Sequence, residues 1–381
     1  MSRIRTHRMT IAPAVLALVV GGCNAIFGVT GGQPGAVCLT ARPAICAPAN
    51  LTDAENCCAP GRTCRGGACS EGECGAVLIT SNKGEEAVEV LVASDLVIWS
   101  SGSARKLYAA STSAGDGTKR VLGTTEGTAF QNISTLAADG DHVYFTDHTS
   151  PDIGRIPLAG GPAEVFVTGN PNDLPPGGSR APSIAVAGGY VYWAGPATGI
   201  FRASIAGPIP AKEEKVADAI NSYGVAVDDA YVYWADYSTS TIRRLAFAKI
   251  GPGAVSEVIA ASTPQFVVFV AVDADSVVWS TDAEVDIAPK QGGNQTYTVL
   301  SNETDSSPNE IWADGRDVFW TTVAYAMGQK GGRLRRISKK GGPVHTIAQN
   351  DSPFGLGGLA GNCDTVFWLD GKTISLMRAT R

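Results

Sequence analysis

The chain has 381 residues, of which 44% are hydrophobic and 17% are charged, and its formal net charge is −6. This composition is typical of a folded protein and excludes a disordered one, and the length favours two or more structural units. A negative chain repels phosphate backbones, which argues against nucleic acid as a partner. The 45 glycines and 21 prolines predict many turns and little helix.

The first residues have the features of an export signal. A start with three arginines precedes an apolar run that ends at Val20. The run has about ten residues, which is too short to cross a bilayer of roughly 30 Å as a helix. We therefore predict a signal peptide over residues 1–22 and a flexible, glycine-containing tether over residues 23–37.

The end of this signal, Val20-Gly21-Gly22-Cys23, resembles the lipobox of bacterial lipoproteins. The resemblance implies that Cys23 carries lipid and becomes the mature N-terminus. Asn24, directly after it, implies the outer membrane by the same resemblance. The expected location is therefore outside the cytoplasm, with a lipid anchor in the membrane. The alternative is an ordinary cleaved signal in which Cys23 is incidental.

Seven of the nine cysteines lie within residues 38–74. In an exported protein, disulfides are the expected state of such a group. Zinc fits less well, because the region has no His and no C-x2-C pair. So short a segment cannot bury enough apolar surface to fold without covalent staples. We predict a small disulfide-rich module over residues 38–74, which acts either as a rigid spacer or as a binding unit.

The spacing C-x7-C-x10-CC-x5-C-x4-C within this module resembles that of inhibitor cystine knots, or knottins. The resemblance implies the pairs Cys38–Cys58, Cys46–Cys64 and Cys57–Cys69. Six cysteines nevertheless allow other connectivities. Once Cys23 and the six cysteines of the knottin-like pattern are accounted for, only Cys74 and Cys363 remain, and we predict that these two pair with each other.

From residue 75 onward one pattern returns seven times: Val, an apolar residue, and then Trp or Phe. The seven aromatic anchors are Trp99, Phe145, Trp193, Trp234, Trp279, Trp320 and Trp368. They lie 41 to 48 residues apart, a period typical of propeller blades with four strands each. We therefore predict an all-β fold, a seven-bladed β-propeller of four-stranded antiparallel blades, over residues 75–381.

A tight turn is expected six residues before each anchor. Asp or Asn, which favour such turns, occupies this place in five copies, and Ala93 and Ala187 occupy it in the other two. The five are Asp139, Asp228, Asp273, Asp314 and Asn362. After the last anchor there is room for a third strand, over residues 373–377, but not for a fourth. A spare strand over residues 76–80 is expected to complete that blade and close the ring, which places Cys74 and Cys363 on one rim.

Three of the anchors resemble the YWTD propellers of lipoprotein-receptor ectodomains. Tyr233-Trp234-Ala235-Asp236 and Tyr144-Phe145-Thr146-Asp147 come nearest, and Phe367-Trp368-Leu369-Asp370 keeps the aromatic pair and the Asp. The resemblance implies the architecture of the domain and not its function. It is incomplete, because receptor YWTD domains have six blades and only three anchors here keep the final Asp.

Residues with catalytic potential are sparse. The chain contains no G-x-S-x-G, H-E-x-x-H or P-loop motif. His142 and His148 flank one predicted strand and have acidic neighbours, and His345 lies in a predicted fourth strand. A solvated turn explains the first two histidines better than a metal site does. We therefore predict no catalytic residue, no metal and no cofactor.

In a propeller, the loops that follow second strands and those that precede first strands lie on one face, around the channel mouth. Here these loops carry Phe130 and the residues predicted to face a ligand, which are Tyr223, Tyr237, Phe266, Tyr325 and Phe354. Some of these aromatics are expected only to close the ends of the core, but six exceed what a solvated surface needs. We predict a cell-envelope lipoprotein with a non-catalytic binding or scaffold role, whose partner is a protein or an envelope glycan. The alternative is a propeller enzyme, a lyase or hydrolase, with its site at the channel mouth.

Overall fold

The structure is a computed structural model. It describes residues 76–81, 87–101, 104–112, 118–171, 183–195, 197–219, 221–261, 266–323, 332–350, 355–362, 365–371 and 375–380, together with the two short strands β1 (Cys69–Ser70) and β2 (Glu73–Cys74). The predicted signal peptide, the tether and most of the cysteine-rich module lie outside these residues. Among the residues described, no helix has the length and apolar character needed to cross a membrane.

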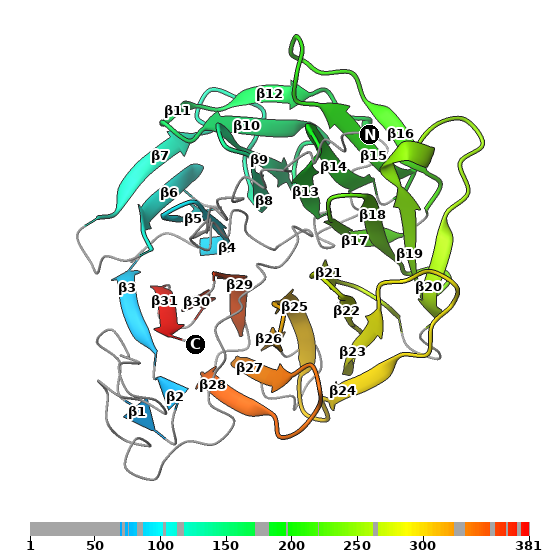
Figure 1. The fold of residues 1–381 in the computed structure, drawn as a ribbon. Helices are drawn as coiled ribbons and strands as arrows, with labels where there is room; N and C mark the ends of the chain where they lie inside the picture. Colours follow the sequence, from blue (N-terminus) through cyan, green and yellow to red (C-terminus); the bar gives the residue numbers. More distant parts are fainter. Residues whose placement is uncertain are drawn as a thin grey trace, which may run out of the picture.

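Seven antiparallel sheets stand around a central axis, as Figure 1 shows, so the predicted seven-bladed β-propeller is confirmed. Blade 1 contains β4 (Ala87–Ala93), β5 (Leu96–Ser101), β6 (Lys106–Ser111) and β7 (Arg120–Thr124). Blade 2 contains β8 (Ile133–Ala138), β9 (His142–Asp147), β10 (Ile153–Pro157) and β12 (Glu164–Val167), and blade 3 contains β13 (Ile184–Ala187), β14 (Tyr190–Gly195), β15 (Gly199–Ser204) and β16 (Glu214–Ala217).

Blade 4 contains β17 (Ser222–Val227), β18 (Tyr231–Asp236), β19 (Thr241–Ala246) and β20 (Glu257–Ala261). Blade 5 contains β21 (Val270–Val272), β22 (Ser276–Ser280), β23 (Glu284–Pro289) and β24 (Thr298–Asn302), and blade 6 contains β25 (Ser307–Ala313), β26 (Asp317–Val323), β27 (Arg333–Ser338) and β28 (His345–Gln349). Blade 7 combines β29 (Leu356–Gly361), β30 (Thr365–Asp370) and β31 (Ser375–Thr380) with β3 (Val77–Ser81) from the other end of the propeller sequence.

The ring closes as predicted, because β3 pairs with β31 along its whole length, from Val77 opposite Arg378 to Ser81 opposite Ser375. The third strand of this blade begins two residues later than expected and runs on to Thr380. Two further elements were not expected, the short 3-10 helix η4 (Phe247–Lys249) after β19 and one additional strand. The short strand β11 (Gly161–Pro162), in the turn between β10 and β12, pairs in parallel with β7 and so adds a fifth strand to the sheet of blade 1.

The predicted turns between first and second strands are present. The side-chain Oδ1 of each of the five Asp or Asn residues accepts hydrogen bonds from backbone N–H groups two or three residues ahead. At Asp228, for example, the donors are Ala230 at 2.8 Å and Tyr231 at 2.8 Å. The two hairpins that have Ala instead use left-handed residues, with Ser94 at φ 54° and Gly188 at φ 58°.

The core lies between the blades. All seven aromatic anchors are buried, and each apolar cluster joins residues of neighbouring blades. The cluster that contains Trp99 of blade 1 also contains Phe367 of blade 7, so the closing blade packs like the others. Trp312, the one tryptophan outside the repeat, lies against Gly361 of the next blade, where a Cβ atom would come within 2.7 Å of its ring. Apolar packing of blade on blade therefore holds the ring together.

Candidate functional site on the loop face

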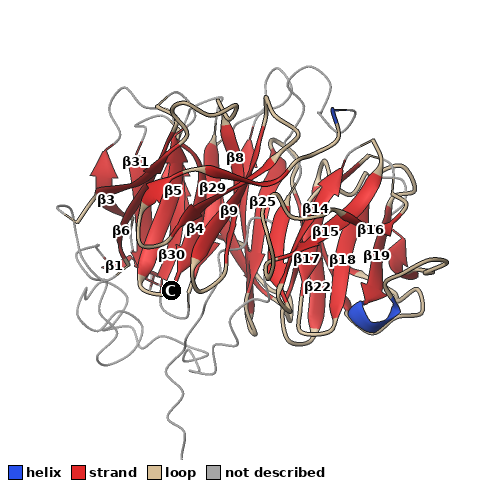
Figure 2. Ribbon diagram, turned by 90° about the horizontal axis from the view of Figure 1, so that it is seen from above, coloured by secondary structure: helices blue, strands red, loops and turns tan. Residues whose placement is uncertain are grey.

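The strands run along the axis of the ring, so the connections gather at its two ends (Figure 2). We call one end the hairpin face: there the first strand of each blade turns into the second, and the third into the fourth. We call the other end the loop face: there second strands lead to third strands, and each blade leads to the next. The two faces differ in how their polar side chains are used.

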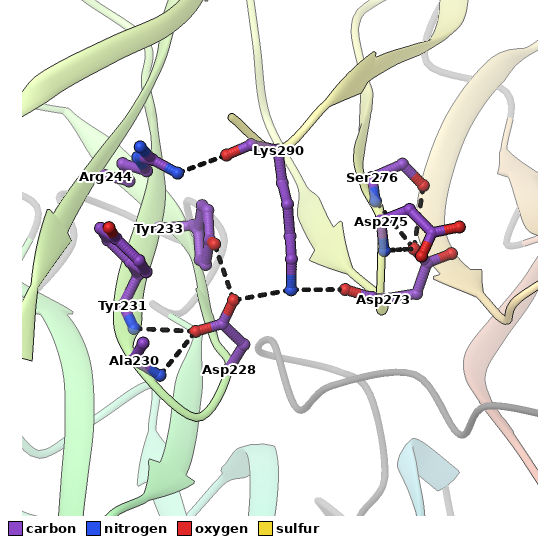
Figure 3. Close-up of polar contacts among 9 residues, drawn as sticks. All are labelled: Asp228, Ala230, Tyr231, Tyr233, Arg244, Asp273, Asp275, Ser276 and Lys290. Carbon is purple, nitrogen blue, oxygen red and sulfur yellow. Dashed lines mark hydrogen bonds and ion pairs between the residues drawn. The ribbon is translucent and has the colours of Figure 1, made fainter. Parts of the chain in front are cut away.

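On the hairpin face, two lysines join three successive blades. The Nζ of Lys290, in blade 5, donates to Oδ2 of Asp228 in blade 4 at 2.8 Å and to the carbonyl oxygen of Asp273 in its own blade at 3.0 Å (Figure 3). The Nζ of Lys339, in blade 6, donates to Oδ2 of Asp273 at 2.7 Å. Burial opposes the ionisation of Asp228, yet hydrogen bonds from Lys290, the Ala230 N–H and Tyr233 lower the pKa of this carboxyl below its ordinary value.

Both lysines occupy a place that recurs around the ring. We call the residue directly after the third strand of a blade the wedge residue. In blades 1 to 6 the wedge residue donates its backbone N–H to the carbonyl of the residue just before the second strand. The six wedge residues are Thr112, Leu158, Ile205, Phe247, Lys290 and Lys339.

In three blades the wedge residue complements the turn of the preceding blade, whereas Ile205 of blade 3 is apolar although the turn of blade 2 has Asp139. Lys290 and Lys339 each face a turn that has an Asp. Phe247 instead faces the turn of blade 3, which has no Asp, and stacks on Tyr192 with ring centroids 5.3 Å apart. Between blades 4 and 5 a pocket of about 530 Å³ remains beside Lys290. Its cations are already paired, Lys290 with Asp228 and Arg244 with Glu257, so we assign this face to the architecture of the ring.

On the loop face, three predicted ligand-facing residues come together between blades 4 and 5. Tyr223 lies in β17, Tyr237 follows β18, and Phe266 precedes β21. The rings of Tyr237 and Phe266 stack with centroids 4.4 Å apart and planes at 9°. Tyr223 meets Tyr237 edge to face, with centroids 6.3 Å apart and planes at 87°. We call these three residues the aromatic cluster.

The aromatic cluster is open to solvent at one end. The side chain of Phe266 is 43% exposed, and the two tyrosines are partly buried. Burial, the charge of Asp282 and the neighbouring Tyr223 raise the pKa of Tyr237 above its ordinary value. The charge of Asp282, which is exposed on the loop between β22 and β23, therefore acts on this ring. The arrangement offers a rigid apolar surface next to one negative charge.

The other predicted loop aromatics do not belong to this cluster. Phe130 is fully buried and packs edge to face on Phe145 at 4.9 Å, so it closes the end of the core and cannot contact a ligand. Tyr325 and Phe354 lie outside the described residues, and their placement at the ligand face stays a prediction. Of the described strands next to these positions, β26 ends and β29 begins on the loop face.

Titratable groups on the loop face are mostly engaged with one another. Arg333 binds both carboxylate oxygens of Asp305 at 2.6 and 2.7 Å, and Arg335 binds the buried Glu303 at 2.7 Å. Nε2 of His148 lies 3.1 Å from Oγ of Ser134, on the innermost strand of blade 2. Among the described residues no three His, Cys, Asp or Glu side chains are grouped as metal ligands would be.

The final Asp of the three YWTD-like anchors caps connections on the loop face. Asp147 accepts hydrogen bonds from the backbone N–H groups of Asn132 and Thr149, both at 2.7 Å. Asp370 accepts from Nδ2 of Asn350, which lies before blade 7. These carboxylates hold backbone and side-chain groups of the connections on the loop face.

The predicted disulfides are not tested by the described residues. Cys23, Cys38, Cys46, Cys57, Cys58, Cys64 and Cys363 lie outside them. Cys69 and Cys74 are described in their backbone, which places the two residues directly opposite each other in the β1–β2 pair. The predicted pairs Cys57–Cys69 and Cys74–Cys363 therefore stay predictions, and the register adds Cys69–Cys74 as a pairing to be distinguished from them.

The fold and its two faces define a β-propeller protein, and the comparisons with known proteins agree with this class. No family model and no curated protein matches the chain. A streptogramin B lyase structure is similar with a TM-score of 0.63 at 11% identity, over 80% of this chain and 97% of that one. Virginiamycin B lyase from Staphylococcus aureus is similar with a TM-score of 0.61 at 15% identity, over 80% and 98% of the chains.

The WD40 propeller domain of Doa1 is similar with a TM-score of 0.59 at 12% identity, over 81% of this chain and 97% of that domain. The neighbours thus include both lyases and a WD40 propeller domain. At these identities the likeness shows the fold alone.

Proposed function

We propose that this protein is a non-catalytic binding or scaffold protein of the cell envelope, which captures its partner on the loop face. The observation that carries this proposal is the aromatic cluster, in which an exposed Phe266 is held by stacking on Tyr237. Rigid aromatic side chains lose little conformational entropy on binding and are enriched where binding energy concentrates. The ring holds them on loops that a stiff scaffold positions, which favours recognition.

The N-terminal residues support an envelope location. The export signal and the lipobox-like segment favour a protein that is exported and held by lipid on Cys23, in the outer membrane. Its partner is then another envelope component, a protein or a glycan. The cysteine-rich module between anchor and propeller acts as a spacer in this proposal, with a binding role for the module as the competing possibility.

The test is a triple substitution on the loop face, Tyr237→Ala, Phe266→Ala and Tyr325→Ala, in the full chain. We expect capture of the envelope partner to weaken by about 10- to 100-fold, since residues of this kind commonly contribute most of a binding energy. Val255→Ala is the matched control, because Val255 is apolar and 79% exposed but lies on the hairpin side. The thermal unfolding temperature should fall only modestly. Capture that survives the triple change, but disappears when residues 38–69 are deleted, would assign binding to the cysteine-rich module instead.

A second candidate function, a propeller hydrolase or lyase with its site at the channel mouth, is favoured by the contact between His148 and Ser134. Burial lowers the pKa of His148, so the imidazole is neutral near pH 7 and able to accept the serine proton. Asp147 is engaged with backbone N–H groups and does not complete a triad. Hydrolysis of simple aryl esters by the protein, abolished by His148→Ala, would establish this function; equal rates for both proteins would dismiss it.

A further inference from the structure

We infer that the aromatic cluster binds a cationic side chain, so that the partner is a protein segment that presents a lysine or an arginine. This inference rests on the proposed function and narrows the partner from a protein or glycan to a basic segment of a protein. It is carried by the geometry of the cluster and by the charges of the elements around it.

The first argument is the arrangement of the rings. Tyr223 and Tyr237 stand at 87° to each other, and Phe266 continues the stack on Tyr237 with an exposed surface. The face of an aromatic ring carries partial negative charge, and a cation within about 6 Å of it is attracted. Contacts of a cation with a single ring occur elsewhere in this chain, where the Arg202 guanidinium lies 4.2 Å from the ring centroid of Tyr190 and the Arg244 guanidinium lies 4.2 Å from that of Tyr231.

The second argument is the carboxylate of Asp282. The backbone N–H of Val268, two residues after Phe266, donates to the carbonyl oxygen of Ser280, two residues before Asp282, at 2.9 Å, which places the exposed Asp282 on the loop next to the cluster. Its charge also raises the pKa of the Tyr237 phenol. Among the residues that the structure describes, no hydrogen-bond donor or cation is paired with the Asp282 side chain. By contrast, the acids elsewhere on this face that we have described, Asp305 and Glu303, each bind an arginine. Asp282 is thus a negative charge beside an aromatic surface, with no counterion among the described residues.

The third argument is the absence of basic residues from the neighbouring sequence. Residues 216–242 and 251–289, which supply the loops that carry the cluster, contain no Lys and no Arg, whereas they contain Asp218, Asp236, Asp282 and Glu284 among other acids. A cation from a partner would therefore meet no Lys or Arg from these loops, and the first basic residue beyond them, Arg243, has its Nε bonded to Ser256. A neutral glycan would stack on the same rings but would gain no binding energy from the charge of Asp282. An experiment that removes this charge therefore distinguishes a basic protein segment from a glycan.

The experiment uses the full chain and two short peptides, acetyl-Gly-Lys-Gly-amide and the same peptide with its lysine Nε acetylated. Proton NMR follows the ε-methylene protons of lysine, which ring currents shift upfield when the ammonium lies over an aromatic face. We expect a saturable upfield shift for the lysine peptide and none for the acetylated one. Asp282→Asn and Phe266→Ala should each weaken binding by about 2- to 30-fold, which corresponds to the range of a single cation–π or charge contact. Raising the salt concentration should weaken binding as well.

The matched control is Asp229→Asn, which removes an exposed carboxylate from the hairpin face and should leave lysine binding unchanged. Asp282→Asn is expected to fold normally because the side chain is exposed, so a loss of binding in this variant cannot be attributed to unfolding. Equal binding of the two peptides, or binding that is insensitive to Asp282→Asn, would overturn the inference.

Two further outcomes separate this inference from the proposed function. If Phe266→Ala reduces capture of the envelope partner but the lysine peptide shows no shift, the loop face is the binding site and its partner is not cationic. If a chitin oligosaccharide binds the cluster and Asp282→Asn has no effect on it, the partner is a glycan and the inference is wrong. If neither the partner nor either probe depends on Phe266, the proposed function fails together with the inference.

Discussion

The bridge that Lys290 forms between blades 4 and 5 makes a quantitative prediction. Lys290→Ala removes the ion pair to Asp228 and the hydrogen bond to the Asp273 carbonyl. The side chains of Lys290 and Asp228 are only 23% and 10% exposed, so the remaining carboxylate stays largely buried without its counter-charge. Breaking a buried pair from one side commonly costs about 3–5 kcal/mol. Asp228 keeps three donors, two backbone N–H groups and the Tyr233 hydroxyl, so we expect a loss of about 2–3 kcal/mol in the free energy of unfolding at pH 7.

The pH dependence of this loss identifies its cause. Because the pKa of Asp228 is lowered in the folded protein, its contribution to stability is present above the unfolded value of about 3.9 and is lost as the pH falls through the folded value. In the Lys290→Ala variant the pKa of Asp228 is higher, so protonation of Asp228 at low pH lowers the free energy of unfolding less than it does in the wild type. The difference in unfolding free energy between wild type and variant should therefore be full at pH 7 and shrink below about pH 4.

Urea denaturation followed by tryptophan fluorescence, at pH 7 and at pH 3.5, measures both quantities. Lys340→Ala is the control, because Lys340 is exposed and next to the wedge residue of blade 6. A double-mutant cycle with Asp228→Asn should give a coupling energy of about 1–3 kcal/mol. A loss below about 0.5 kcal/mol at pH 7, or the same loss at both pH values, would refute the claim that this ion pair holds the two blades.

Two further predictions concern the cysteines. Cys23→Ala should abolish incorporation of labelled palmitate and release the protein from membranes; unchanged labelling would mean that the lipobox interpretation is wrong. Peptide mapping without reduction should recover Cys74 linked to Cys363, a bond that closes a long loop and contributes up to roughly 5 kcal/mol in the chain-entropy model. A linked Cys69–Cys74 peptide would instead agree with the β1–β2 backbone register, and it would end both the Cys74–Cys363 prediction and the knottin pair of Cys69.

The architecture could be predicted because it depends on sequence patterns that span only a few residues. The anchor triplet fixes the second strand of every blade, and the Asp or Asn before it fixes the turn, since its side chain bonds to its own backbone. The spare strand at residues 77–81 was predictable from counting, because a ring that lacks one strand leaves unpaired backbone groups. These features depend on residues a few positions apart and on closure, and not on distant contacts.

The polar contacts between blades could not be predicted in the same way. Lys290 reaches an Asp that lies 62 residues earlier, and nothing near Lys290 in the sequence indicates that partner. The repeat itself gave no general rule, because the Asp228 and Asp273 turns are followed one blade later by the wedge lysines Lys290 and Lys339, but the Asp139 turn is followed by the apolar Ile205. The burial of Phe130 could not be predicted either, because its position in a loop does not indicate that its ring packs on Phe145.

The strand that closes the ring, β3, also determines how the propeller would respond to a mechanical pull on its N-terminal side. β3 pairs antiparallel with β31, so it enters blade 7 at the hairpin face, with Val77 opposite Arg378, and leaves at the loop face. If lipid on Cys23 holds the N-terminal side, a pull from the membrane enters the propeller at Val77, on the hairpin face, and the aromatic cluster lies on the opposite face.

Tension between a partner on the loop face and the membrane would then run along β3. Such a pull shears the hydrogen bonds of the β3–β31 pair together and cannot open them one at a time. The closure that completes the fold would thus also make the ring resistant to being pulled open.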